Sequence, residues 1–122
     1  MPFISFIVPM FNVERYVGEC MESVLRQPFG DWEMILIDDC SMDGSAAIAA
    51  GYAAADSRIT VMRNRENLGP GPLRNVGLTR ASGEYLFFLD ADDVINPDQL
   101  RHLHNAVQRA GHPEMMQVGY SS

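Results

Sequence analysis

The sequence contains no lysine, and all nine of its basic residues are arginine. A P-loop needs a lysine to reach nucleotide phosphates, and Schiff-base catalysis needs a lysine amine, so both kinds of site are excluded. The basic residues form no run, and the formal net charge is −7. With this charge, the bulk surface is not expected to bind nucleic acid or an anionic membrane.

Cysteines and long hydrophobic segments are also scarce. Cys20 and Cys40 are too few for a disulfide framework, which favours a reduced, cytoplasmic setting. The inner face of the membrane is a second expected location. The apolar run over residues 3–8 stops at Pro9, far short of the roughly 18 residues that indicate a membrane span. No positively charged segment precedes this run, so a signal peptide is not expected.

What the chain does contain is an alternation of strand and helix patterns. Apolar runs predict strands over residues 3–8, 33–37, 59–62, 85–89 and 114–120. Amphipathic or alanine-rich segments predict helices over residues 13–25, 45–55, 72–81 and 97–110. This alternation predicts an α/β fold with a mostly parallel sheet flanked by helices, in one domain over residues 1–122.

Several residues are expected to mark where these elements begin or end. Pro9 is predicted to end the first strand, and Asn12 to cap the helix that follows. Ser45 is predicted to cap the alanine-rich helix, and Asn96 and Gln99 to form a capping box around Pro97. No element follows the last predicted strand, so we expect the domain to be truncated and able to form a homodimer through an exposed sheet edge.

The stretch from Tyr85 to Asp93 is the most informative segment of the chain. Five apolar residues predict a buried strand, and three carboxylates follow it directly. Side chains two apart in an extended segment point the same way, so Asp90 and Asp92 are expected to face one spot while Asp93 turns aside. Two oxygen ligands there suit Mg²⁺ or Mn²⁺. The alternative is an acidic loop that ends the strand and caps the next helix.

Two further polar clusters, at residues 9–12 and 38–43, follow other predicted strands. In a parallel sheet all three clusters lie along one edge, which predicts a binding crevice. Asp39 could accept a hydrogen bond from a base or ribose there, or could belong to a helix-capping loop. Phe11 could stack on a base or belong to the core, and Arg74 could bind a diphosphate or be a surface residue.

Four motifs in this order resemble the N-terminal half of family 2 glycosyltransferases. They are Ile7–Asn12, Ile35–Ser45, Glu66–Gly77 and Gly83–Asp93. The resemblance covers nearly the whole chain. It implies the Rossmann-like nucleotide-binding half of a GT-A fold. It also implies inverting transfer of a sugar from a nucleotide-activated donor, expected to be UDP-linked, to a glycan, lipid or other acceptor, as in polysaccharide biosynthesis.

The resemblance also implies roles for individual residues in nucleotide binding. Pro9, Phe11 and Glu14 would line the nucleoside pocket. Asp39 would hydrogen-bond the base, and Arg74 would help to hold the nucleotide.

The resemblance implies a metal site as well. Asp90 would contact ribose or the metal, and Asp92 would bind Mg²⁺ or Mn²⁺ bridging the diphosphate, where the ion neutralises charge on the leaving group.

The sequence departs from the family pattern at a few positions. Cys40 and Met42 stand where glycine and threonine are usual, and Val76 stands where a second arginine is frequent. No residue matches the family's catalytic base, which is expected beyond residue 122, so the chain alone is expected to bind nucleotide without transferring sugar. A non-catalytic nucleotide-sugar-binding module and an unrelated α/β module with acidic loops are the alternatives.

Overall fold

The computed structural model describes residues 2–96, 98–110 and 117–121. It contains one sheet of parallel strands in the order β3-β2-β1-β4-β5. The strand bounds are β1 Ile4–Met10, β2 Trp32–Asp38, β3 Ile59–Arg63, β4 Tyr85–Leu89 and β5 Gln117–Ser121. The β5 prediction therefore holds for 117–120, while residues 114–116 lie outside the described part of the chain.

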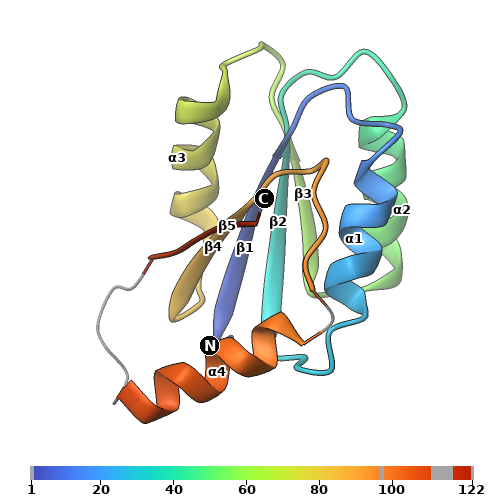
Figure 1. Cartoon of the computed structure of the whole chain (residues 1–122). Coiled ribbons are helices and arrows are strands. Elements are labelled where there is room, and N and C mark those ends of the chain that lie inside the picture. Colours follow the sequence, from blue (N-terminus) through green and yellow to red (C-terminus); the bar gives the residue numbers. More distant parts are fainter. Residues whose placement is uncertain (1, 97, 111–116, 122) are drawn as a thin grey trace.

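The helices lie on both faces of this sheet (Figure 1). Their bounds are α1 Val17–Leu25, α2 Ser45–Ala55, α3 Pro70–Arg80 and α4 Gln99–Ala110. Helices α1 and α2 cover one face, α3 covers the other, and α4 lies near the N-terminal end of β1 (Figure 1). The predicted α/β class with a parallel sheet flanked by helices is confirmed. No helix among the described residues is both long and apolar enough to cross a membrane.

The alternation of side chains along β1 divides the hydrophobic core between the two faces. Phe6, Val8 and Met10 pack in a cluster with the apolar residues of α1, α2 and α4. Ile7 belongs to a second, smaller cluster that includes Leu73 of α3. Burying one large apolar side chain contributes roughly 1.5–3 kcal/mol, so continuous burial on both faces accounts for the unbroken apolar runs of the central strands. Cys20 of α1 is fully buried in the larger cluster.

Two predictions about the first strand and helix are wrong. Pro9 does not end β1, because Pro9 still pairs with Ile37 and the strand continues to Met10. The β4 ladder reaches only Ile7, so Pro9 lies beyond it and needs no amide hydrogen for a bond on that side. Asn12 does not cap α1, since α1 begins at Val17 and Asn12 has a left-handed backbone with φ 51°.

The predicted caps of the later helices are only partly right. Ser45 is the first helical residue rather than the cap, and the Asp43 carboxylate accepts the Ser45 amide hydrogen at 2.9 Å. Asn96 and Gln99 do form one half of a capping box, because the Asn96 amide donates to Gln99 Oε1 at 3.4 Å. Pro97 lies outside the described residues.

Candidate functional site

The strand order places a crevice at the carboxyl ends of β1 and β4. All strands run in one direction, so the loops that follow them meet at one edge, uppermost in Figure 1. This confirms the expectation that the three polar clusters share an edge. β2 and β3 lie on one side of β1, whereas β4 and β5 lie on the other, so successive connections diverge between β1 and β4. Ligands of open α/β sheets bind at such a divergence.

A cavity of about 180 Å³ lies at this point. It is lined by Pro9, Met10, Phe11, Asp39, Leu73, Arg74 and Asp90. The structure thus brings together five of the six residues that the sequence analysis proposed for nucleotide binding. Met10 and Leu73 were not foreseen, although each stands next to a predicted residue within the same motif.

The aromatic wall of the pocket comes from the end of β1. Phe11 directly follows the strand, and 45% of its surface is exposed, so its ring is available to a ligand rather than buried in the core. An exposed ring beside an acidic and a basic side chain suits a planar, hydrogen-bonding group such as a nucleobase.

Asp39 joins the end of β2 to the beginning of α3. Its buried carboxylate accepts hydrogen bonds from the amides of Leu68 (2.7 Å) and Gly69 (3.0 Å). Gly69 has φ 83°, a conformation that favours glycine and lets the chain turn into α3. The Asp39 carboxylate therefore holds the start of α3 against the pocket while its remaining acceptor sites stay available to a ligand.

Arg74 lies in the first turns of α3 and lines the same pocket as Phe11. Its guanidinium lies over the Phe88 ring, 5.9 Å from the ring centre. Burial and the neighbouring aspartates raise the pKa of Asp90, and the positive charge of Arg74 partly opposes this effect. Arg74 is therefore close enough to the acidic cluster to act on its charge. A cation at a helix N-terminus favours an anionic ligand such as a diphosphate.

The structure does not bring Glu14 to this pocket. The Glu14 carboxylate instead accepts a hydrogen bond from the Gly44 amide at 3.1 Å, on the loop after β2. Glu14 therefore connects two loops, and the sequence pattern alone could not show this because the two positions are 30 residues apart.

Three carboxylates gather directly after β4. Asp90, Asp92 and Asp93 each offer an oxygen, and these oxygens lie within 4.8 Å of one another. The expectation that Asp93 turns aside is wrong. The chain leaves the extended conformation after Leu89, and the Asp93 amide donates to the Asp90 carbonyl at 3.0 Å, so this turn returns Asp93 to the cluster.

The electrostatics of this cluster favour a cation. Partial burial, followed by the charges of Asp93 and Asp92, raises the pKa of Asp90 above its ordinary value. Three converging hard oxygen donors are the ligand set that Mg²⁺ and Mn²⁺ prefer, and a divalent ion would relieve the repulsion between them. The residues present therefore fit such an ion.

Cys20 lies beneath this cluster but does not extend it. Its Sγ donates to the Asp90 carbonyl at 3.7 Å. Burial, followed by the nearby aspartate charges, raises the pKa of the Cys20 thiol to about 12. The neutral thiol is a poor metal ligand, so the set of candidate ligands consists of oxygen atoms.

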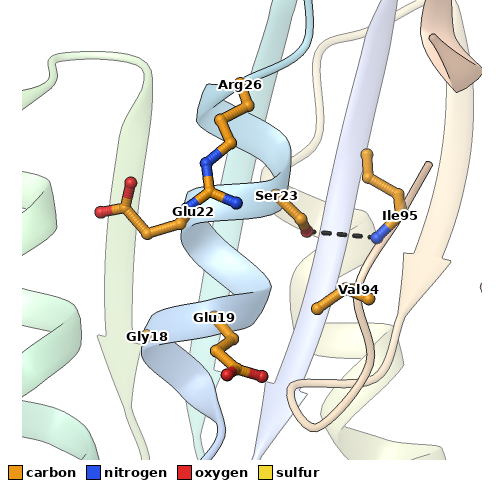
Figure 2. A pocket seen from close by; sticks show the side chains of 7 residues that line it. All are labelled: Gly18, Glu19, Glu22, Ser23, Arg26, Val94 and Ile95. Carbon is orange, nitrogen blue, oxygen red and sulfur yellow. Dashed lines mark hydrogen bonds between the residues drawn. The ribbon is translucent and has the colours of Figure 1, made fainter. Parts of the chain in front are cut away.

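A larger cavity, of about 470 Å³, shares no lining residue with the pocket at this edge. It runs between α1 and the segment after the acidic cluster, where Ser23 Oγ accepts a hydrogen bond from the Ile95 amide at 3.2 Å (Figure 2). The Glu22 carboxylate, which accepts a hydrogen bond from Tyr52 at 2.8 Å, points away from Val94 (Figure 2). The ends of the strands do not converge at this larger cavity. We therefore assign the candidate site to the pocket of about 180 Å³, although it is the smaller of the two.

Comparison with known proteins identifies the family. The sequence model described as "Glycosyl transferase family 2" matches residues 5–115. The chain belongs to glycosyl transferase family 2. Because a transferase family matches nearly the whole chain, an unrelated α/β module with acidic loops is no longer an alternative.

The curated relatives of this family 2 chain are bacterial glycosyltransferases. It is 43% identical over 99 residues to the putative teichuronic acid biosynthesis glycosyltransferase TuaG of Bacillus subtilis, covering 81% of this chain and 39% of TuaG. It is 34% identical over 105 residues to glycosyltransferase GlyG of Streptococcus pneumoniae, covering 86% of this chain and 35% of GlyG. The chain therefore spans well under half the length of these relatives.

Solved structures confirm the fold of the family 2 chain. TarS of S. aureus, residues 1–349 in complex with UDP, superposes with a TM-score of 0.83 at 34% identity, covering 88% of this chain and 32% of that one. The mannosyltransferase PcManGT of Pyrobaculum calidifontis, in complex with GDP-Man and Mn²⁺, gives 0.77 at 25% identity, covering 88% and 32%. The architecture is thus the Rossmann-like half of a GT-A glycosyltransferase.

Proposed function

We propose that this chain forms the donor-binding half of an inverting glycosyltransferase that uses a nucleotide-activated sugar. One observation carries the proposal: Phe11, Asp39, Arg74 and Asp90, from four separate segments, line one pocket at the divergence of β1 and β4. An aromatic ring, an acceptor for a base edge, a cation and an acidic cluster are the chemistry that a nucleoside diphosphate with a bound metal requires.

Each wall of the pocket takes one part of the donor. Pro9 and Phe11 bind the faces of the nucleoside, and the Asp39 carboxylate accepts a hydrogen bond from the base. Arg74 pairs with the diphosphate, and Asp90 contacts ribose or the metal. UDP is our preferred nucleotide. TarS was solved with UDP and with UDP-GlcNAc, and PcManGT with GDP-Man, which supports a nucleotide-sugar donor.

Asp92 is the principal metal ligand in this proposal, with Asp90 and Asp93 beside it. The cluster would hold Mg²⁺ or Mn²⁺, and the Mn²⁺ of the PcManGT complex supports a divalent ion. When bound, such an ion neutralises the charge that builds up on the departing diphosphate. Asp90, Asp92 and Asp93 hold that ion, while Arg74 adds positive charge on the pocket side.

Calorimetric titration with UDP, with and without Mn²⁺, tests this proposal. We expect metal-dependent binding that Asp92→Asn weakens about 10–100-fold, since loss of a charged ligand should cost at least as much as loss of an outer-shell partner. Asp98→Asn is the matched control, because Asp98 forms an ion pair with Arg101 on α4 and lies outside the pocket. Failure of UDP, GDP and dTDP alike to bind the folded chain would reject the donor site.

The acceptor, a glycan, lipid or other hydroxyl compound, would need a base to remove its proton. No residue of the chain matches the family's base, so we propose that the chain binds the donor in the cytoplasm, or at the inner face of the membrane, without transferring sugar. Transfer from UDP-linked sugars to water or to added acceptors by the purified chain would contradict this.

A further inference from the structure

The loop after β1 is joined to the loop after β2 by consecutive backbone amides. Three successive amide groups of the first loop each donate to a side-chain oxygen of the second loop or of Ser45, the first residue of α2. The bonds are Asn12 N to Ser41 Oγ at 3.0 Å, Val13 N to Ser45 Oγ at 2.8 Å, and Glu14 N to Asp43 Oδ2 at 3.1 Å. A stretch of chain that could otherwise hydrogen-bond only to water is thus held by its neighbour.

Two side chains of the first loop also accept hydrogen bonds from backbone amides of the second loop. Asn12 Oδ1 accepts a hydrogen bond from the Met42 amide at 2.8 Å, and Glu14 Oε1 accepts one from the Gly44 amide at 3.1 Å. We call these five hydrogen bonds between residues 12–14 and 41–45 the loop interlock. Because backbone and side chain serve on both loops, neither loop can shift without breaking bonds of the other.

Backbone conformation at the interlock is unusual. Asn12 has φ 51° and Cys40 has φ 64°, and they are the only residues other than glycine with positive φ in the described part of the chain. Side chains disfavour this left-handed region, and it persists where the surroundings impose it. Two such residues at one junction indicate that the interlock determines the path of both loops.

The Ser41 side chain is held by the last residue of β2. The Ser41 hydroxyl donates to Asp38 Oδ1 at 2.5 Å, and the Asp38 carboxylate also lies 3.3 Å from Arg63 Nε. Asp38 is fully buried, which makes this paired carboxylate a fixed point at the end of β2. The Asn12 amide therefore connects through Ser41 to the rigid sheet.

The interlock touches the donor pocket only through chain neighbours. Phe11 directly precedes Asn12, and Asp39 lies two residues before Ser41. Phe11 and Asp39 line the pocket, whereas no interlock residue does. We propose that Asn12, Ser41, Asp43 and Ser45 are positioning residues that preset the Phe11 ring and the Asp39 carboxylate for the nucleoside. This inference rests on the proposed donor site. A pocket arranged in advance binds more tightly because less ordering is lost on binding.

The Asn12 side chain offers a clean test. Asn12→Gly keeps the left-handed backbone accessible but removes the oxygen that accepts the Met42 amide. Calorimetry of the 122-residue chain with UDP and Mn²⁺ should show a Kd raised about tenfold, the value of one well-placed hydrogen bond. Asn12→Asp retains an acceptor oxygen and should restore most of the affinity. Backbone amide exchange should quicken at residues 12–14 and 41–45 but not in the strands.

Val107→Ala provides the matched control for general destabilisation. Val107 is buried in α4, outside both the pocket and the interlock, so its truncation should lower thermal stability and leave the Kd unchanged. An Asn12→Gly chain that binds as tightly as wild type overturns the inference alone. If the Kd of Val107→Ala rises as much as that of Asn12→Gly, the inference is also overturned, because a general loss of stability would then explain the weaker binding. Failure of the wild-type chain to bind overturns the donor site and the inference together.

Discussion

At Gly77, the absence of a side chain lets α3 lie directly on the sheet. A Cβ added there would stand 2.6 Å from Ile7 Cγ2 and 2.7 Å from Ile37 Cδ1, both on buried core side chains. Gly77→Ala should therefore lower the free energy of unfolding by about 1–3 kcal/mol, the usual cost of overpacking a core. Chemical denaturation monitored by the fluorescence of Trp32 measures this change.

Gly51 provides the opposite case on α2. Nothing lies within 4 Å of a Cβ added there, and the position is exposed. Gly51→Ala should raise the free energy of unfolding by roughly 0.5–1 kcal/mol, because alanine loses less conformational entropy in a helix. If both glycines respond alike, helix propensity rather than contact with the sheet governs Gly77.

Single residues also show where reasoning from the sequence stopped. The alternation of side chains in a strand correctly placed Asp90 at a shared edge, but it misplaced Asp93, because the alternation holds only while the chain stays extended. Glu14 was assigned to the pocket through the family resemblance alone. Its actual partner, the Gly44 amide, lies on a loop that only folding brings close.

At the scale of elements, Glu33 ties β2 to β1 and to the segment between α3 and β4. Its carboxylate accepts hydrogen bonds from Ser5 Oγ at 2.5 Å and from the amide and hydroxyl of Ser82 at 2.6 and 2.9 Å. Partial burial raises the pKa of Glu33, but these hydrogen bonds together lower it by a larger amount. The pKa of Glu33 therefore lies below the ordinary value of 4.5. The ionised form therefore stabilises the folded chain.

This shift predicts a pH-dependent effect of Glu33→Gln. A lowered pKa contributes stability above the unfolded value of 4.5, and that contribution is lost as the pH falls through the folded value. At pH 7 the variant should be less stable by about 1–2 kcal/mol, with allowance for partial exposure. The difference should shrink below pH 4.5 in urea titrations. If the difference in free energy of unfolding between wild type and Glu33→Gln stays constant down to acid pH, the shape of the side chain rather than its charge causes the difference.

Element boundaries were predicted best where packing set them. The bounds of β4 were predicted to the residue, because its buried apolar run defines them. The start of α1 was missed by several residues, since Asn12 is engaged by the loop after β2 instead of by its own helix. Local capping rules cannot anticipate a partner that is distant in the sequence.

At the scale of the whole molecule, β5 lies at one end of the sheet and pairs with β4 alone among the described strands. An unpaired strand edge is a template for pairing with another chain. We therefore expect the purified chain to self-associate, with a molar mass from light scattering that rises with concentration. A constant monomer mass over the full concentration range would contradict this expectation.

Periodicity and the four motifs were sufficient to predict a parallel α/β sheet, polar clusters at one edge, and the family, because buried strands and helix faces leave a local pattern in the chain. The strand order β3-β2-β1-β4-β5 leaves no such pattern. That order alone determines that the ends of β1 and β4 are neighbours and that Phe11, Asp39, Arg74 and Asp90 share one pocket. The loop interlock likewise joins segments about 30 residues apart, so only tertiary packing decides it.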